Sequence, residues 1–277
     1  MNKLKYILTV FTLALLAACS QDDAFTGTNE EDATETVAVT FNAQVDYSIA
    51  EAGSGAEAPA SIAATRSDGT ADEMPTRYYA QAITQDGSEA TEVVEGTVNP
   101  AGGCNFRLNV KPGVEYDFLF WADNATGNPA PDNLRAVPYA KGSVAFACQS
   151  KGTAGSAVTD ITLGHVVAKV SLMSTTEVPE GTVISLTCSS GTIYNVLTKA
   201  CSESEPFTFE YTTGRAIGAD NKVAATYLLP TDNRAITVSV NGHENTINNV
   251  PLEANTCITL KGDLSGTVNA NAVQEGF

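Results

Sequence analysis

Apolar and polar residues alternate at a period of two in many short segments of this chain, and this feature constrains its fold most strongly. The segments 37–45 and 114–122 show the alternation most clearly, and in the second of them the apolar positions are Val114, Tyr116, Phe118 and Phe120. A period of two places neighbouring side chains on opposite faces of a β-strand. Each such segment therefore predicts a strand that buries one face.

The rest of the chain repeats this pattern, with turns rich in Gly, Pro, Asn and Asp between the segments. Further strands are expected at residues 78–84, 92–98, 105–110, 143–148, 157–163, 183–187, 192–197, 207–212, 223–229, 235–240, 245–250 and 256–262. Asn241-Gly242 predicts a type I′ hairpin turn, because both residues tolerate positive φ. After the first residues no segment shows a sustained 3.6-residue apolar stripe, so the sequence predicts an all-β fold of β-sandwiches.

A second series of strands begins near His165 and suggests two sandwiches in tandem. Val166, Ala168, Val170 and Leu172 line one face there, much as the segment 37–45 opens the first series. We expect an N-terminal sandwich over residues 36–163 and a C-terminal sandwich over residues 164–277. Residues 48–72 are rich in Ala, Gly, Ser and Glu, and predict a long exposed loop.

The first eighteen residues have the pattern of a secretory signal peptide. Lys3 and Lys5 precede a mostly apolar run from Tyr6 to Ala18, which is shorter than the roughly 20 residues that cross a bilayer. Residues 1–18 are therefore expected to be removed. Residues 19–35 are polar and acidic without periodicity, and predict a flexible linker.

The order Leu16-Ala17-Ala18-Cys19 resembles the bacterial lipobox, in which a peptidase cuts before a cysteine whose thiol carries a diacylglyceryl group. The interpretation predicts cleavage between Ala18 and Cys19 and a lipoprotein with palmitate-type chains at Cys19. Each methylene buried in the bilayer adds roughly 0.8 kcal/mol to the free energy of membrane binding, so more than one acyl chain gives a stable anchor. The expected location is the outer membrane, facing outward, because Ser20-Gln21-Asp22-Asp23 resembles an acidic surface-export tag. A solvated linker is the alternative interpretation of these four residues.

The charge of the chain excludes several classes of partner. The formal net charge is −17, and loss of Lys3 and Lys5 with the signal peptide would make it −19. Nucleic-acid binding depends on Lys and Arg that displace counterions from phosphates, so it is disfavoured here. Docking on anionic lipid is disfavoured for the same reason.

No residue pattern indicates catalysis, a metal site or a cofactor. The two histidines, His165 and His243, have no second ligand at the spacing of a zinc site, and nucleophile-elbow, phosphate-loop and dinucleotide motifs are absent. The pairs Asp22/Asp23 and Glu203/Glu205 could in principle hydrolyse glycosides, but solvated loops are the simpler interpretation. We therefore expect a protein that is not an enzyme, with no metal and no cofactor.

Five cysteines follow Cys19 and show no C-x-x-C spacing, so they indicate neither a zinc site nor a disulfide scaffold. They are Cys104, Cys148, Cys188, Cys201 and Cys257. Most are expected to pack as small apolar residues in strands. One disulfide is compatible with the sequence, which does not say which pair would form it.

Trp121 is the only tryptophan, and two interpretations of it stay open. An aromatic face can stack on a sugar ring, and a tryptophan can equally pack in a core. Trp121 lies on the strand face opposite Phe118 and Phe120. We favour packing, at a rim or between sheets.

Several segments, taken in order, resemble the fimbrillin-like surface lipoproteins of anaerobic Gram-negative bacteria, and the resemblance covers most of the chain. It rests on the lipobox, the strand 37–45, and the segments Ala64-Thr65-Arg66, 116–123, Val167-Ala168-Lys169-Val170, Leu228-Leu229-Pro230 and 255–262. The resemblance implies two transthyretin-like, Greek-key β-sandwiches. In stalk subunits of this family a protease cuts after an arginine and removes the first strand, which implies Arg66 as a candidate processing site.

The function implied by the resemblance is a non-catalytic structural or accessory subunit, either an anchor or an adhesin, that associates with other fimbrial subunits by β-strand contacts. Residues 265–277 lack convincing alternation and would make a poor donor strand, so we favour a member that keeps its lipid. A host or glycan ligand is compatible with this role. The alternative is a surface glycan-binding lipoprotein of a polysaccharide-uptake system, which shares the anchor, the acidity and the β-rich body.

Overall fold

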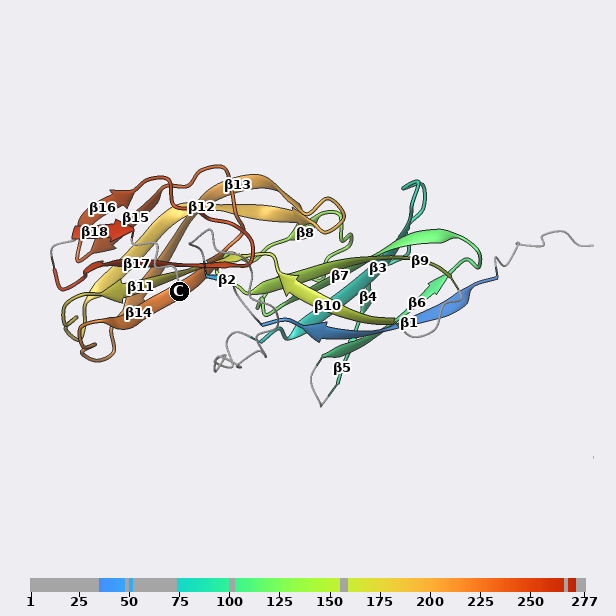
Figure 1. Cartoon of the computed structure of the whole chain (residues 1–277), viewed down its shortest axis with the longest axis horizontal. Helices are drawn as coiled ribbons and strands as arrows, with labels where there is room; N and C mark the ends of the chain where they lie inside the picture. The colour runs from blue at the N-terminus through green and yellow to red at the C-terminus, as the bar shows by residue number, and fades with distance from the viewer. Residues whose placement is uncertain are drawn as a thin grey trace, which may run out of the picture. The chain divides into compact units, whose positions relative to one another are not determined.

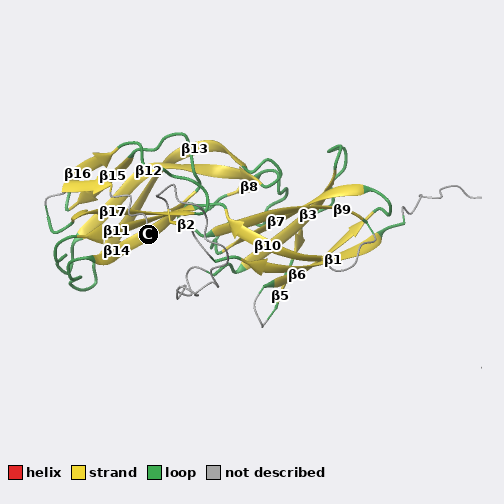
Figure 2. Ribbon diagram, in the orientation of Figure 1, coloured by secondary structure: helices red, strands yellow, loops and turns green. Residues whose placement is uncertain are grey.

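The computed structural model describes residues 35–47, 74–99, 103–154 and 159–266, with the backbone of 50–51 and 269–272. Its described residues form strands and no helix, so the fold is all-β, as the alternation predicts (Figures 1 and 2). No described segment is a helix that could cross a membrane. The first ten strands are β1 (Val37–Val45), β2 (Ala50–Glu51), β3 (Arg77–Thr84), β4 (Val94–Glu95), β5 (Thr97–Val98), β6 (Cys104–Val110), β7 (Glu115–Asp123), β8 (Val137–Pro138), β9 (Ala145–Thr153) and β10 (Thr159–His165). The others are β11 (Ala168–Ser174), β12 (Val183–Asn195), β13 (Ala200–Thr212), β14 (Asn221–Leu228), β15 (Ile236–Val240), β16 (His243–Ile247), β17 (Thr256–Asp263) and β18 (Asn269–Ala272).

The first half of the chain forms one eight-stranded sheet in the order β4-β3-β7-β9-β10-β1-β6-β5. β1 lies inside this sheet, antiparallel to β6 and parallel to β10. β4 and β5, at the two ends of the order, are separated only by Gly96, whose N–H donates to the Tyr78 carbonyl at 2.9 Å. The sheet therefore curls until its two edges meet, and one core fills the space inside.

That core is built from the apolar positions that the alternation predicts. Val39, Phe41 and Ala43 of β1 are buried, and β6 alternates buried and exposed residues along its whole length. The ring of Phe41 lies 4.8 Å from that of Phe118 and 4.9 Å from that of Phe120. Close packing of these aromatic rings contributes more than their buried area alone.

β7 departs from the predicted pattern, because both of its faces are buried. Only Glu115 at its start is exposed, while Asp117, Leu119 and Trp121 on the second face are buried together with the predicted first face. The covering residues come from the connection after β7 and from β12, since Leu134, Val137 and Tyr194 belong to the same core. A polar residue such as Asp117 in a strand thus does not mark a solvent-facing side here.

The second half of the chain supplies four strands to each of two five-stranded sheets, which lie around a second core. The β11 sheet has the order β14-β11-β17-β18, with β2 beside β17, and the β12 sheet has the order β13-β12-β15-β16, with β8 beside β12. The core includes Val170 and Leu172 from the β11 sheet and Leu186 and Val238 from the β12 sheet. This is the sandwich arrangement expected for strands that each bury one face.

Local turn chemistry is confirmed between β15 and β16. Asn241 has φ of 47° and Gly242 has φ of 84°, and Val240 pairs with His243 across this two-residue turn.

The two strands predicted separately at 183–187 and 192–197 form one thirteen-residue strand, β12. Ser189-Ser190-Gly191 favours a break locally, but pairing with the equally long β13 carries the strand through it.

Two short strands of the first half pair with the sheets of the second half. β2 pairs with β17 through Ala50 and Glu51, and β8 pairs with β12 through Val137 and Pro138. Tyr139 also donates its hydroxyl to the Tyr227 carbonyl at 3.1 Å. The division into sandwiches at 163/164 stays a prediction.

Candidate functional site

The residues predicted to be modified or cut lie outside the described part of the chain. These are Ala18 and Cys19 at the expected lipidation site and Arg66 at the expected processing site. β1, the first strand to be described, follows the linker that Cys19 would tether. All three assignments stay predictions.

Trp121 is a core residue, in agreement with the interpretation that we favour from the sequence. Its side chain is 0% exposed, and its ring lies 5.6 Å from that of Tyr194. The indole Nε1 donates to Asp123 Oδ2 at 2.6 Å. The ring has no free face for a sugar to stack on.

Asp123 forms the polar centre of this region. Two nitrogens of Arg77 donate to its carboxylate, Nε at 2.7 Å and Nη2 at 2.9 Å. The backbone N–H of Ala125 donates to the same carboxylate at 3.1 Å. The hydrogen bond with Asp123 raises the pKa of Arg77 above its ordinary value. Because every partner of Asp123 is part of the fold, this is a structural ion pair and not a reactive group.

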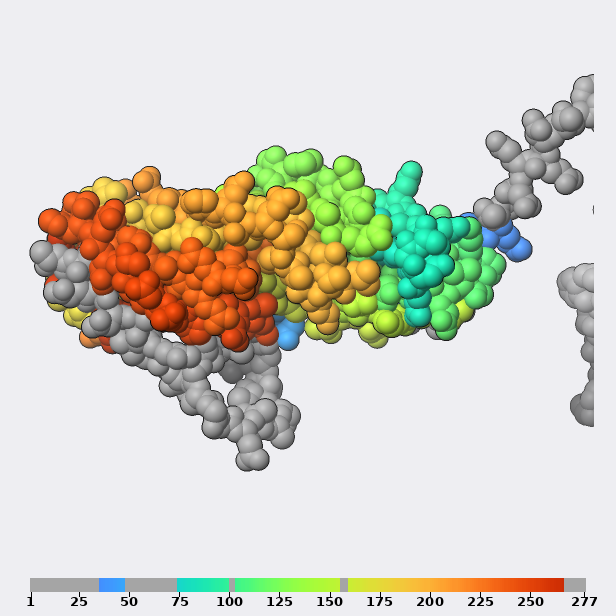
Figure 3. Space-filling view, turned by 90° about the horizontal axis from the view of Figure 1, so that it is seen from above, coloured from blue at the N-terminus to red at the C-terminus, as the bar shows by residue number. Residues whose placement is uncertain are grey.

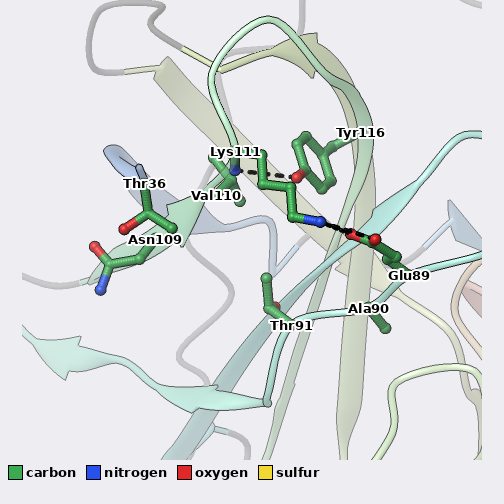
Figure 4. Close-up of a pocket in the computed structure, with 8 residues that line it drawn as sticks. All are labelled: Thr36, Glu89, Ala90, Thr91, Asn109, Val110, Lys111 and Tyr116. Atoms are coloured by element: carbon green, nitrogen blue, oxygen red, sulfur yellow. Dashed lines mark hydrogen bonds and ion pairs between the residues drawn. The ribbon is translucent and has the colours of Figure 1, made fainter. Parts of the chain in front are cut away.

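A shallow cavity of about 160 Å³ lies beside β6 and β7 (Figure 4). It is lined by Thr36, Glu89, Ala90, Thr91, Asn109, Val110, Lys111 and Tyr116. Lys111 Nζ contacts both carboxylate oxygens of Glu89, at 2.6 and 2.8 Å, and this hydrogen bonding raises the pKa of Lys111. The lysine charge is therefore neutralised locally, and the cavity offers little to recognise an anion.

The remaining candidates from the sequence do not converge. His165 is buried with its ring 4.1 Å from that of Phe146, whereas His243 is exposed at the start of β16. Glu205 accepts from Lys141 Nζ at 2.7 Å, and both Glu203 and Glu205 are exposed on β13. In the ranges that the structure describes, no three His, Cys, Asp or Glu side chains are grouped as metal ligands.

All five cysteines of the described region are free thiols. Cys104 and Cys188 are buried, and burial raises their pKa to about 12 and about 11. Only the thiolate is a nucleophile, so such a thiol is inert near neutral pH. These residues behave as small apolar side chains.

The feature of the described chain best suited to contact another protein is the outer edge of β13. β13 is thirteen residues long and ends the β12 sheet, and within the described ranges only β12 pairs with it. Its residues are mostly exposed. β13 lies along the upper side of the view in Figure 1, and Figure 3 shows the molecule from that side. An edge strand presents unpaired N–H and C=O groups that can bind a further strand.

Hydrogen bonds at the ends of β12 and β13 fix which residues point outward. Thr213 N–H donates to the Thr182 carbonyl at 3.0 Å, so Thr213 faces β12. Val183 faces β15 instead, because its carbonyl accepts from Asn241 N–H at 2.9 Å. Since backbone groups alternate along a strand, Thr208, Glu210 and Thr212 direct their N–H and C=O away from β12.

The two halves of this edge differ in how well they are protected. Glu203 breaks the regular backbone with φ of 59°, Pro206 has no N–H, and Lys141 Nζ lies 3.3 Å from the Pro206 carbonyl. Bulges, prolines and lysines are common devices against strand addition. The stretch Phe207–Thr212 contains none of them and keeps an unbroken register with β12. We call this stretch the open edge.

The side chains of the open edge divide between the two faces of the sheet. Phe207, Phe209 and Tyr211 pack against the second core, while Thr208, Glu210 and Thr212 are exposed. The sequence predicts a strand at 207–212, but it gives no signal that this strand is an edge. That property depends on which strands pair elsewhere in the sheet.

No family model and no curated protein matches this chain. Solved structures do, including a fimbrial assembly protein from Parabacteroides distasonis at 11% identity, covering 83% of this chain and 92% of that chain with a TM-score of 0.46. A candidate cell adhesion protein from Bacteroides fragilis matches at 13% identity, covering 86% of this chain and 98% of that chain with a TM-score of 0.46. A candidate adhesin from Bacteroides thetaiotaomicron matches at 9% identity, covering 88% of this chain and 98% of that chain with a TM-score of 0.48.

The names of these proteins fit the fimbrillin-like resemblance of the sequence. Their identities to this chain are low and their TM-scores are 0.46 to 0.48, so the likeness assigns neither a function nor a partner to it. The matches cover 83 to 88% of this chain.

Proposed function

We propose that this chain is a non-catalytic, lipid-anchored subunit of the bacterial cell surface, of the fimbrillin-like type, which associates with other subunits through β-strand contacts. The observation that carries the proposal is the open edge, where Thr208, Glu210 and Thr212 direct away from β12 backbone groups that pair with no other described residue. Strand addition draws its affinity from such groups.

The position of β1 supports an anchor or adhesin that stays intact. β1 pairs on both sides, over Val37–Ala43 with β6 and over Phe41–Val45 with β10, and its apolar side chains fill the first core. A cut after Arg66 would therefore leave β1 bound unless another strand replaced it. With β1 in place, the linker before it keeps the fold tethered through Cys19.

The glycan-binding alternative has no comparable support. It predicts a cluster of exposed aromatic side chains, and Trp121 is buried. A glycan array that gave specific binding to the wild-type protein would revive it.

The strand-contact role is tested by photo-crosslinking on the living cell surface. A photoreactive phenylalanine replaces Thr208 on the open edge or, as a matched control, Thr246. Thr246 lies on β16 at the opposite edge of the same sheet, across Thr187 and Thr237 in the same row of residues. We expect the first probe to form adducts with another surface protein and the second to form few. Equal yields, or adducts from the Thr246 position alone, would refute the role.

The anchor is tested by mass spectrometry of the protein recovered from the outer membrane. We expect a lipid-modified Cys19 and an uncut Arg66. A chain that begins after Arg66 and runs in high-molecular-weight ladders would instead identify a stalk subunit.

A further inference from the structure

We infer that the open edge binds an extended segment of a partner chain that carries Lys or Arg opposite Glu210 and apolar residues opposite Phe209 and its neighbours. This inference rests on the proposed function and adds the chemistry of the partner. It follows from three properties of Phe207–Thr212: its free backbone groups, its two faces and its charge.

The backbone of the open edge can pair with a strand of about six residues. Thr208, Glu210 and Thr212 each offer one backbone N–H donor and one backbone C=O acceptor. The backbone groups of Phe207 and Phe209 point toward β12 instead. A single hydrogen bond contributes little net binding free energy, but several of them acting together support reversible binding. Phe, Thr and Tyr are also residues that favour strands, so the edge is already in the conformation that binding requires.

The two faces specify alternate residues of the partner. Phe207, Phe209 and Tyr211 are only partly buried at the rim of the second core. Apolar partner residues on that side would extend the core. On the other face, Thr208 lies in a row of four threonines with Thr187, Thr237 and Thr246, in which Thr187 contacts Thr208 at 3.0 Å and Thr237 contacts Thr246 at 2.8 Å. Partner residues on this outer face would therefore be polar.

The charge of the outer face selects a basic partner. Glu210 is exposed, and its neighbour across the pair is Ser185, which carries no charge. Among the described residues Glu210 forms no ion pair, whereas Glu205 is already neutralised by Lys141. Opposite charges directly across a strand pair are favourable. A Lys or Arg of the partner opposite Glu210 would form an ion pair with its carboxylate.

A second copy of the same chain fits less well than a basic partner. Two copies would each carry a formal charge of −17 and would bring two open edges, each with its own Glu210, together. Repulsion between two copies of the same negative charge suppresses their association at low salt. We therefore assign the open edge to a basic segment of another protein.

The test uses fluorescence anisotropy with the whole mature protein and two nine-residue labelled peptides. In the first peptide valine alternates with lysine and threonine, and in the second every lysine is replaced by glutamate. We expect the lysine peptide to bind at least about tenfold more tightly, a difference of roughly 1.4 kcal/mol. Binding of the lysine peptide should weaken as salt is raised, because the contact with Glu210 is exposed.

Two proline variants locate the site. Thr208→Pro removes an outward N–H from the open edge and no backbone hydrogen bond to β12, and Pro206 shows that this strand accepts proline. It also removes the Thr208–Thr187 hydroxyl contact, just as the control Thr246→Pro removes the Thr246–Thr237 contact. Thr246→Pro is the matched control, since Thr246 belongs to the same threonine row and lies on β16 at the opposite edge. We expect Thr208→Pro to weaken binding of the lysine peptide about tenfold, because one hydrogen bond is lost and the ring obstructs the incoming strand. Thr246→Pro should leave binding within about twofold, since it leaves every contact of the open edge in place.

A charge variant decides the matter if Thr208→Pro fails to fold. Glu210→Lys should reverse the preference, so that the glutamate peptide binds more tightly than the lysine peptide. The inference is overturned if wild-type protein binds neither peptide or both equally, or if Thr246→Pro causes the same loss as Thr208→Pro. Self-association of wild-type protein in sedimentation, abolished by Thr208→Pro, would assign the edge to a second copy. Adducts from the Thr208 probe on cells, together with failure of the peptides, would reject the basic partner while leaving the proposed function intact.

Discussion

At the scale of single residues, the carboxylate of Asp123 holds together three segments near the end of β7. It accepts from Arg77 on β3, from Trp121 on β7 itself and from the Ala125 N–H in the following loop. The side chain of Asp123 is 3% exposed and that of Arg77 is 17% exposed. Removing one partner of a buried pair is costly, because the other charge stays behind without compensation.

Asp123→Asn should therefore lower the free energy of unfolding by about 3 to 5 kcal/mol. Urea denaturation followed by tryptophan fluorescence measures the loss directly. Glu89→Gln is the control, because its partner Lys111 and Glu89 itself are exposed, and we expect no measurable change. Equal effects of the two variants would show that burial does not govern the Arg77 pair.

The buried thiol of Cys188 gives a pH dependence with a defined sign. Burial raises its pKa from 9.0 to about 11, so the folded state disfavours the thiolate. The stability from a neutral thiol is complete below pH 9 and is lost as the pH rises toward 11. In Cys188→Ala, the free energy of unfolding should fall less steeply between pH 9 and pH 11 than in the wild type. Parallel curves for the two proteins would contradict the assignment.

At the scale of elements, the junction between β4 and β5 closes the eight-stranded sheet. A Cβ at Gly96 would overlap Cys104 Sγ and would lie 2.6 Å from Phe106 Cε1. Both neighbours are buried in the first core, so they have little room to move. The close approach of this turn to the core requires glycine.

Gly96→Ala should lower the free energy of unfolding by about 1 to 3 kcal/mol, the usual cost of overpacking a core. Thermal unfolding by circular dichroism measures it, and adding Cys104→Ala should restore part of the loss. Gly164→Ala on β10 is the control, because a Cβ there meets nothing within 4 Å. A neutral result for Gly96→Ala would mean that the junction is looser than these contacts require.

At the scale of the whole molecule, the described chain contains two hydrophobic cores and an acidic surface. The first core fills the inside of the eight-stranded sheet and extends over the second face of β7, and the second core lies between the β11 and β12 sheets. The formal charge of −17 favours solubility. Retention at the membrane is therefore assigned in our proposal to the lipid at Cys19 alone.

Cys19→Ser should abolish incorporation of labelled palmitate and shift the protein from the membrane fraction to the soluble fraction. The expected physical reason is that no other part of the proposed mature chain supplies the buried methylenes of an anchor. Cys104→Ser is the control, because Cys104 lies on β6 inside the fold. Membrane retention of Cys19→Ser would overturn the anchor.

The class of fold can be predicted from the sequence, since the signals involved are local. β1 has the predicted bounds Val37–Val45, and the turn at Asn241-Gly242 has the predicted positive φ at both residues. A period of two and a pair of turn residues act within a few residues of chain, so they can be read without knowing the partners. The candidate sites at Cys19 and Arg66 are predictions of the same local kind.

Which strand faces are covered and which sheet edges stay open depends instead on how distant segments pack. The second face of β7 is buried because distant residues such as Leu134 and Tyr194 cover it, and Asp117 gives no warning of this. β13 is an edge because β15 takes the other side of β12, while nothing in Phe207–Thr212 differs from a central strand. Burial and pairing depend on segments far apart in the chain, so they cannot be predicted from the local alternation of apolar and polar residues.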